Sequence, residues 1–108
     1  MQWPGDGSRR ARGDGAEGLA AAWLERQGYR VVARNHRTRR GEVDLICRDG
    51  ETLCFVEVRS RARTDYGSPV ASVTVAKARR VVAAATHYAL RHGGLEQPMR
   101  FDVVGVDL

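Results

Sequence analysis

The sequence predicts an α/β fold in which a mixed central sheet is flanked by helices, with the elements in the order α-β-β-β-α-β. Two observations carry this prediction: short apolar runs bounded by turn residues, and two longer segments whose apolar residues recur at helical spacing. The second helical segment lies between two strands, and a right-handed crossover makes such strands parallel. At 108 residues the chain is long enough for one domain with one modest core.

Residues 1–13 are rich in Gly and Arg and show no periodicity, which predicts a flexible basic tail before a single domain over residues 14–108. The first helix should begin at Asp14, which can cap it, with Glu17 three residues later as in a capping box. Gly28 should end this helix.

Three strands should follow the first helix. Residues 29–34 form the first strand, and an arginine-rich loop over 35–41 separates it from the second strand at 43–48. The third strand, 52–59, is joined to the second across Asp49-Gly50, which is a strong hairpin signal.

The rest of the chain predicts a loop, a helix and a strand. Residues 60–68 are polar and basic, and a long helix should begin near 69–73 and end at about Arg91, before two glycines. One side of this helix is formed by Val73, Lys77, Val81, Ala84 and Tyr88. The last strand, 100–106, is apolar enough to be central in the sheet.

The charge of the chain favours an anionic partner. The formal net charge is +5 and the pI is near 10.0, with most of the positive charge on arginine, which suits bidentate contacts with phosphate. Nucleic acid is therefore the expected partner, although many soluble domains are basic only for colloidal reasons.

Composition also indicates the compartment. No apolar run approaches the roughly 20 residues that span a bilayer, and the N-terminus lacks the apolar stretch of a signal peptide, so a soluble cytoplasmic protein without membrane contact is expected. Cys47 and Cys54 lie in apolar stretches and are expected to be small buried hydrophobes in a reducing compartment. A disulfide between adjacent strands is the alternative.

Two acids in the predicted hairpin form the main candidate site. With a two-residue turn at Asp49-Gly50, Asp44 and Glu57 become diagonal neighbours on one face, about 7 to 8 Å apart at the backbone. Arg59 has the same parity and should share that face. Two converging carboxylates are ligands that Mg²⁺ prefers. The alternative is a pair of solvent-facing acids that bind nearby arginines, but the apolar surroundings would make an unpaired charge costly. A three-residue turn would separate the pair.

Two further residues each allow a structural and a functional interpretation. Glu17 is either the capping-box acid or, in line with Ala20 and Leu24, an inward-facing acid that reaches the sheet near Asp44. Lys77 is either a lysine that snorkels at the rim of the helix or an ammonium placed over the sheet near a phosphate.

Basic residues gather in the two loops that flank the hairpin, with one aromatic residue among them. They form a candidate surface for phosphate contact and base stacking, or else a solvated basic face. These candidate nucleic-acid-binding residues are Arg34, Arg37, Arg39, Arg40, Arg61, Arg63 and Tyr66.

Several of these motifs together resemble a known family. The chain contains the motifs GEVDLI at 41–46, FVEVRSR at 55–61 and RFDVV at 100–104, with Lys77 and Arg80 in the long helix. In these features it resembles the YraN family of small bacterial proteins, and through it the PD-(D/E)xK nuclease superfamily. The resemblance covers nearly all of residues 14–106.

The resemblance implies a fold, a metal site and a reaction. It implies a restriction-endonuclease-like αβββαβ core in which Asp44, Glu57 and the backbone carbonyl of Val58 hold Mg²⁺ or Mn²⁺. Glu17 is similar to the first-helix acid that resolvase-like members add to the site. The implied reaction is metal-dependent endonuclease hydrolysis of phosphodiester bonds in DNA, branched or single-stranded. Two cuts on a two-fold substrate would call for a homodimer.

One position departs from the superfamily pattern. The lysine of the ExK signature is Arg59 in this chain, and a guanidinium cannot act as a general base in proteins. Either Asp44, Glu57, Arg59 and Lys77 form a catalytic site in which Lys77 replaces the missing lysine, or the protein is a non-catalytic nucleic-acid-binding or complex-assembly module on a nuclease fold.

Overall fold

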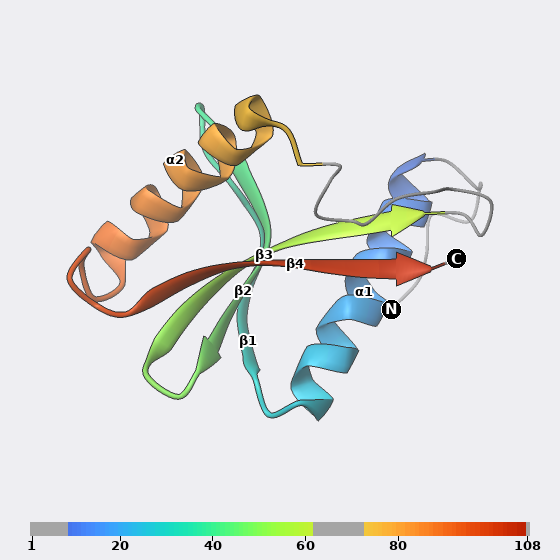
Figure 1. The fold of residues 1–108 in the computed structure, drawn as a ribbon, viewed down its shortest axis with the longest axis horizontal. Helices are drawn as coiled ribbons and strands as arrows, with labels where there is room; N and C mark the ends of the chain where they lie inside the picture. Colours follow the sequence, from blue (N-terminus) through green and yellow to red (C-terminus); the bar gives the residue numbers. More distant parts are fainter. Residues whose placement is uncertain (1–8, 62–72, 108) are drawn as a thin grey trace.

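The computed structural model describes residues 9–61 and 73–107 and has the predicted order of elements (Figure 1). The elements are α1 (Arg9–Arg26), β1 (Arg30–Arg37), β2 (Glu42–Asp49), β3 (Thr52–Arg61), α2 (Val75–Arg91) and β4 (Met99–Asp107). The strands form a four-stranded sheet in the order β1-β2-β3-β4. The first three strands are antiparallel, and β4 runs parallel to β3, so the mixed sheet and the parallel crossover are confirmed.

The sheet carries a core on each face, one under each helix. Leu53 and Phe55 of β3 pack with residues of α2, whereas Cys54 and Val56 pack with residues of α1. This division follows from the alternation of side chains along a strand, because successive residues point to opposite faces. A continuous apolar run in β3 is therefore buried on both sides.

The predicted position of the last strand is wrong. Among the described strands β4 pairs with β3 alone and lies at the edge of the sheet rather than at its centre. Val104 and Val106 pack against the core under α1, but the side of Phe101 that does not stack on Phe55 is open, and Phe101 is 52% exposed. The apolar residues of this strand therefore cover one face of the sheet, and they do not show that the strand is central.

The predicted start of the first helix is also wrong. Helix α1 begins at Arg9, so Asp14 and Glu17 lie inside it and do not form a capping box at its start. The helix ends as predicted, with Gly28 at φ 95° directly after it. Glu17 is buried and lies in the inward-facing row of the helix, together with Ala20 and Leu24.

Other boundaries differ from the prediction as well, and β3 continues to Arg61, two residues into the predicted loop. Strand β1 continues to Arg37, so residues 35–37 are strand rather than loop, because they pair with the start of β2. The remaining turn at 38–41 is closed by Thr38, whose hydroxyl oxygen accepts hydrogen bonds from the backbone N–H groups of Arg40 and Gly41, each at 3.1 Å. Helix α2 begins at Val75, and Thr74 caps it.

The hairpin between β2 and β3 is shifted by one residue from the predicted turn. Gly50 and Glu51 form the turn, and Asp49 pairs with Thr52. Gly50 has φ 60°, as expected for glycine at the first central position of a tight hairpin turn. The pairing partner of each β2 residue therefore moves by two positions, which preserves the face on which every side chain lies.

The two cysteines lie opposite each other in this hairpin. Cys47 pairs with Cys54, and both are buried free thiols, which confirms the expectation of small buried hydrophobes. Burial raises the pKa of Cys47 to about 11, so the thiolate form is disfavoured. Across residues 9–61 and 73–107, no helix has the length and apolar character needed to cross a membrane.

Candidate functional site

The acid pair lies where the pairing of β2 and β3 ends. The regular register runs from the turn to Leu45 opposite Val56, and continuing it by one step places Asp44 opposite Glu57. The predicted register, which paired Asp44 with Phe55, is wrong, because Phe55 pairs with Ile46. Asp44 reaches across to β3, where its Oδ2 accepts a hydrogen bond of 2.8 Å from the backbone N–H of Val58.

Glu57 is an unusual buried acid. Its residue is 5% exposed, and its Oε1 lies 3.2 Å from Nζ of Lys77 and 3.6 Å from a guanidinium nitrogen of Arg59. Its Oε2 is buried and has no hydrogen-bond partner within the described part of the chain. Burial raises the pKa of Glu57, repulsion from Asp44 raises it further, and Lys77 opposes both effects. The negative charge of Glu57 is therefore only partly compensated, because its cationic neighbours contact Oε1 and not Oε2.

Helix α2 supplies the ammonium at this site. The hydroxyl of Thr74 accepts a hydrogen bond of 3.1 Å from the backbone N–H of Lys77, which fixes the first turn of α2 over the sheet. From this turn the side chain of Lys77 extends to Glu57, and Lys77 is the only lysine of the chain. The interpretation as a lysine that merely snorkels at the rim does not describe this contact.

Glu17 reaches the sheet beside the acid pair and does not join it. The carboxylate of Glu17 is buried and accepts a hydrogen bond of 2.9 Å from the side-chain amide of Asn35. Asn35 lies across from Asp44, because Arg34 pairs with Leu45 and His36 with Val43. In the described ranges no three Asp, Glu, His or Cys side chains converge as a metal cluster. Glu17 is therefore a neighbour of the site through Asn35.

The donor set fits a hard divalent cation. The oxygens available at the end of the β2–β3 ladder are the Asp44 carboxylate, the open Oε2 of Glu57 and backbone carbonyls, which are the ligand types of Mg²⁺ and Mn²⁺. A cation would offset both causes of the raised pKa of Glu57, its burial and the repulsion from Asp44. The single unpartnered buried oxygen is the observation that supports this fit.

Part of the predicted basic surface comes together beside α2. An open hollow of about 690 Å³ is lined by Arg37, Thr38, Arg39, Arg40, Ala83 and His87. Arg34 lies on β1 and is not part of this lining. Arg61 is the last residue of β3, and Arg63 and Tyr66 lie outside the described residues. The acid pair is not among the residues that line the hollow.

Two features of the site have no signal in the sequence pattern. Nε2 of His36 lies 3.1 Å from Nδ1 of His87, which joins β1 to α2 although the two residues are far apart in the chain. Gly41 packs directly on α2, since a Cβ atom at this position would lie 1.9 Å from the carbonyl oxygen of Arg80. The occurrence of Gly41 within the GEVDLI motif was the only indication of its importance.

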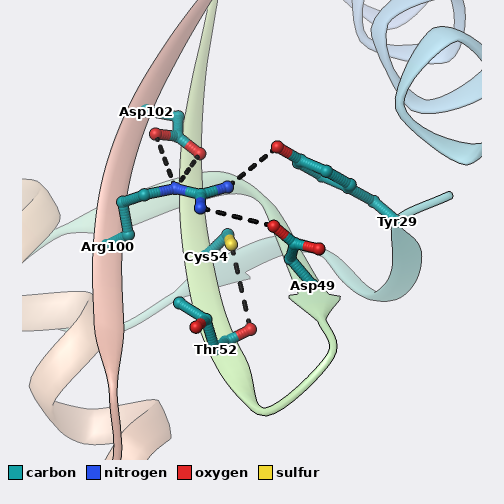
Figure 2. A network of polar contacts seen from close by, with 6 residues as sticks. All are labelled: Tyr29, Asp49, Thr52, Cys54, Arg100 and Asp102. Carbon is teal, nitrogen blue, oxygen red and sulfur yellow. Dashed lines mark hydrogen bonds and ion pairs between the residues drawn. The ribbon is translucent and has the colours of Figure 1, made fainter. Parts of the chain in front are cut away.

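A separate polar network holds the opposite end of the sheet together (Figure 2). Nε of Arg100 donates to both carboxylate oxygens of Asp102 at 3.1 and 3.0 Å, and its other nitrogens reach Asp49 at 3.4 Å and the hydroxyl of Tyr29 at 2.9 Å. The network joins β4 to the hairpin and to the turn after α1. The RFDVV motif thus has a structural role at this end.

Comparison with known proteins places the chain in a family. The model of the uncharacterised protein family UPF0102 matches residues 16–106. A UPF0102 protein of Anaeromyxobacter sp. (strain Fw109-5) is 64% identical over 100 residues, which are 93% of this chain and 75% of the relative. One from Anaeromyxobacter dehalogenans (strain 2CP-C) is 65% identical over 102 residues, 94% of this chain and 75% of the relative. One from Dechloromonas aromatica (strain RCB) is 53% identical over 107 residues, 99% of this chain and 88% of the relative. The resemblance seen in the motifs is thereby confirmed, and the chain belongs to the UPF0102, or YraN, family.

Proposed function

We propose that this protein is a metal-dependent endonuclease that hydrolyses phosphodiester bonds in DNA. The observation that carries the proposal is the buried, unpartnered Oε2 of Glu57, which lies beside the Asp44 carboxylate at the point where two strands separate. Two carboxyl groups this close repel each other unless a proton or a cation lies between them, and a net charge of +5 favours a polyanionic substrate.

Asp44, Glu57 and the backbone carbonyl of Val58 are the proposed ligands of Mg²⁺ or Mn²⁺. A divalent cation held there supplies charge neutralisation for the phosphate and makes water more acidic. The chain's own residues do the rest: Val58 N–H fixes the orientation of Asp44, and Lys77 fixes one oxygen of Glu57 while the other stays open.

Arg59 and Lys77 have different capacities in this proposal. Arg59 keeps its proton, so its role is to stabilise negative charge on the phosphate as the bond breaks. Lys77 can donate hydrogen bonds in the same way, through a compact ammonium with three donors that already contacts Glu57. The 30% exposure of its side chain leaves it accessible to substrate.

A non-catalytic nucleic-acid-binding or complex-assembly module is the second candidate. One observation favours it, namely the arginine at the position where the superfamily motif has lysine. This candidate predicts binding that falls with salt and is indifferent to chelator and to Asp44→Asn.

The test is a cleavage assay with variants of the acid pair. Labelled duplex, nicked, single-stranded and four-way-junction DNA are incubated with the purified protein and Mg²⁺ or Mn²⁺. We expect cleavage that EDTA, Asp44→Asn and Glu57→Gln each reduce at least about 100-fold, as is typical when charge stabilisation is lost at a reacting centre. Glu51→Gln, which removes an exposed acid from the hairpin turn, is the matched control and should leave cleavage unchanged. Cleavage that survives Asp44→Asn would exclude the proposed site, and binding without any cleavage would favour the second candidate.

A further inference from the structure

The basic hollow beside α2 has a composition suited to an anion. Three of its six lining residues are arginines, Thr38 and His87 add polar groups, and none of the six is acidic. Arg37 is partly neutralised by Glu42, whose Oε2 lies 3.3 Å from its Nε. Arg39 and Arg40 are exposed at the tip of the β1–β2 turn, so their guanidinium groups can reach a ligand in the hollow.

The turn that carries these arginines is held in place from both sides. Gly41 packs against the backbone of α2 at Arg80, where any side chain would collide with the carbonyl oxygen. Within the turn, the N–H of Thr38 donates to the carbonyl of Gly41 at 2.8 Å, and the Thr38 hydroxyl accepts from two backbone groups. Arginines on a rigid turn lose less conformational freedom on binding than arginines on a mobile loop.

A histidine pair lies beside the hollow. His36 and His87 lie within hydrogen-bond distance, and Tyr88 makes a T-shaped contact with His36 and stacks on His92. Burial lowers the pKa of His36, and the nearby His87, His92 and Arg91 lower it further. The neutral form of His36 is therefore favoured, so the pair offers hydrogen-bonding groups while the arginines supply the positive charge.

We infer that the hollow binds a backbone phosphate of a polynucleotide, at a position separate from the phosphate at the acid pair. This inference rests on the proposed function for its geometry. Ala83 and His87 follow Lys77 by six and ten residues, which corresponds to about 9 and 15 Å along the helix. A ligand that contacts both places must therefore carry at least two phosphates spaced along a strand. The substrate is accordingly a polynucleotide and not a mononucleotide.

The test compares two double variants that remove the same charge. Arg39→Gln/Arg40→Gln removes two arginines from the hollow. Arg26→Gln/Arg30→Gln removes two exposed arginines outside it, the last residue of α1 and the first residue of β1. Binding to labelled DNA is measured by fluorescence anisotropy in EDTA at several salt concentrations. We expect the hollow variant to bind at least about tenfold more weakly and to lose about two from the salt slope, whereas the control loses less than about threefold. Equal losses in the two variants would overturn the inference, because general charge would then account for binding.

A length series identifies the ligand. Single-stranded oligonucleotides of two to twenty nucleotides are compared, with inorganic phosphate and a mononucleotide as competitors. The penalty of Arg39→Gln/Arg40→Gln should appear only with oligonucleotides long enough to reach both the acid pair and the hollow, and His87→Gln should produce a smaller loss with the same length dependence. A penalty that is independent of length, or displacement of DNA by millimolar inorganic phosphate, would overturn the polynucleotide assignment in favour of a small-anion site.

The same experiment separates the two proposals. Binding in EDTA does not depend on the acid pair, so Asp44→Asn should leave the hollow's contribution intact. If the hollow variant loses binding and the wild type does not cleave DNA, the proposed phosphate site in the hollow stands and the proposed nuclease activity is rejected. If the wild type cleaves DNA and the two double variants bind equally well, the proposed nuclease activity stands and the proposed phosphate site in the hollow is rejected.

Discussion

Glu57→Gln tests whether the negative charge of Glu57 destabilises the protein when no cation is bound. The substitution removes the negative charge and nearly preserves the shape of the side chain. Without a divalent ion, the Glu57 carboxylate is buried, has one unpartnered oxygen and faces Asp44, while Lys77 and Arg59 compensate only its other oxygen. The net effect is a raised pKa, which means that the folded state favours the neutral form. Because glutamine resembles that neutral form, we expect Glu57→Gln to stabilise the metal-free protein at pH 7.

The size of the effect follows from the unpaired oxygen. A buried polar atom without a partner costs about 1 to 3 kcal/mol, and the loss of the contacts with Lys77 and Arg59 offsets part of that gain. Those two side chains are 30% and 34% exposed, so each can be solvated by water when the carboxylate is gone. We expect a net stabilisation of about 1 kcal/mol, which corresponds to an increase in Tm of about 4 °C in a domain of this size.

The pH dependence has a definite sign. The pKa of Glu57 is raised in the folded state from its ordinary value of 4.5, so the folded protein binds this proton more tightly than the unfolded chain does. Its contribution to stability is fully present below pH 4.5 and is lost as the pH rises through the raised pKa. The advantage of Glu57→Gln over the wild type should therefore grow as the pH rises from 4.5 to neutrality.

Urea and thermal unfolding in EDTA, from pH 4.5 to 8, measure this difference. Glu51→Gln is the control, because it removes an exposed acid from the same hairpin and should change stability by less than about 0.5 kcal/mol. Added Mg²⁺ or Mn²⁺ should raise the stability of the wild type, by about 2.7 kcal/mol at 100 times the Kd, and should do so much less for Glu57→Gln. A Glu57→Gln protein that is less stable than the wild type at pH 7 in EDTA would refute the reasoning.

Four further substitutions, two beside the site and two at the opposite end of the sheet, are tested by urea unfolding and circular dichroism. Gly41→Ala should destabilise the protein by about 1 to 3 kcal/mol, because its Cβ would overlap the carbonyl oxygen of Arg80. In the control Gly15→Ala, the new Cβ meets no atom within 4 Å, so this variant should not be destabilised. Equal effects of the two substitutions would show that the turn does not depend on close packing. Thr74→Ala should cost about 1 kcal/mol through loss of the cap of α2, and Thr74→Ser should restore most of it; a neutral Thr74→Ala would show that the cap adds nothing. Arg100→Gln and Tyr29→Phe should each cost about 1 kcal/mol, and their double-mutant cycle should be non-additive because the two residues share a hydrogen bond; additive effects would count against a network at this end of the sheet.

Hydrophobic patterning was sufficient to predict the element order and a mixed sheet with a parallel crossover, but not the edge position of β4. The two-residue hairpin was predicted correctly in kind, but the sequence cannot distinguish a turn at Asp49-Gly50 from one at Gly50-Glu51. Both have glycine at a central position, and the two registers bury the same set of side chains. A shared face for Asp44 and Glu57 follows from either register, whereas the register itself was not predictable.

The errors at element ends have a different origin. Residues 35–37 are polar, yet they continue β1 because the start of β2 provides their hydrogen-bond partners, and local composition carries no information about such a partner. The same limitation hid the contact of Asn35 with Glu17 and that of His36 with His87, each of which joins elements distant in the chain. Contacts of this kind depend on how the helices pack over the sheet, which follows only from the assembled fold.

The composition of the chain sharpens the question raised by Arg59. The sequence contains 18 basic residues, and every one of them except Lys77 is arginine. Phosphate contact alone would be served at least as well by arginine, which binds phosphate through two parallel hydrogen bonds. What distinguishes lysine is a compact, strongly hydrated ammonium on a flexible stem, with three donors that are not held in one plane. The sole lysine lies 3.2 Å from the buried acid, closer than Arg59 at 3.6 Å. The one lysine of the chain thus lies at the acid pair, and in the proposed nuclease this compact ammonium, on α2 and not on β3, would contact the phosphate beside Glu57.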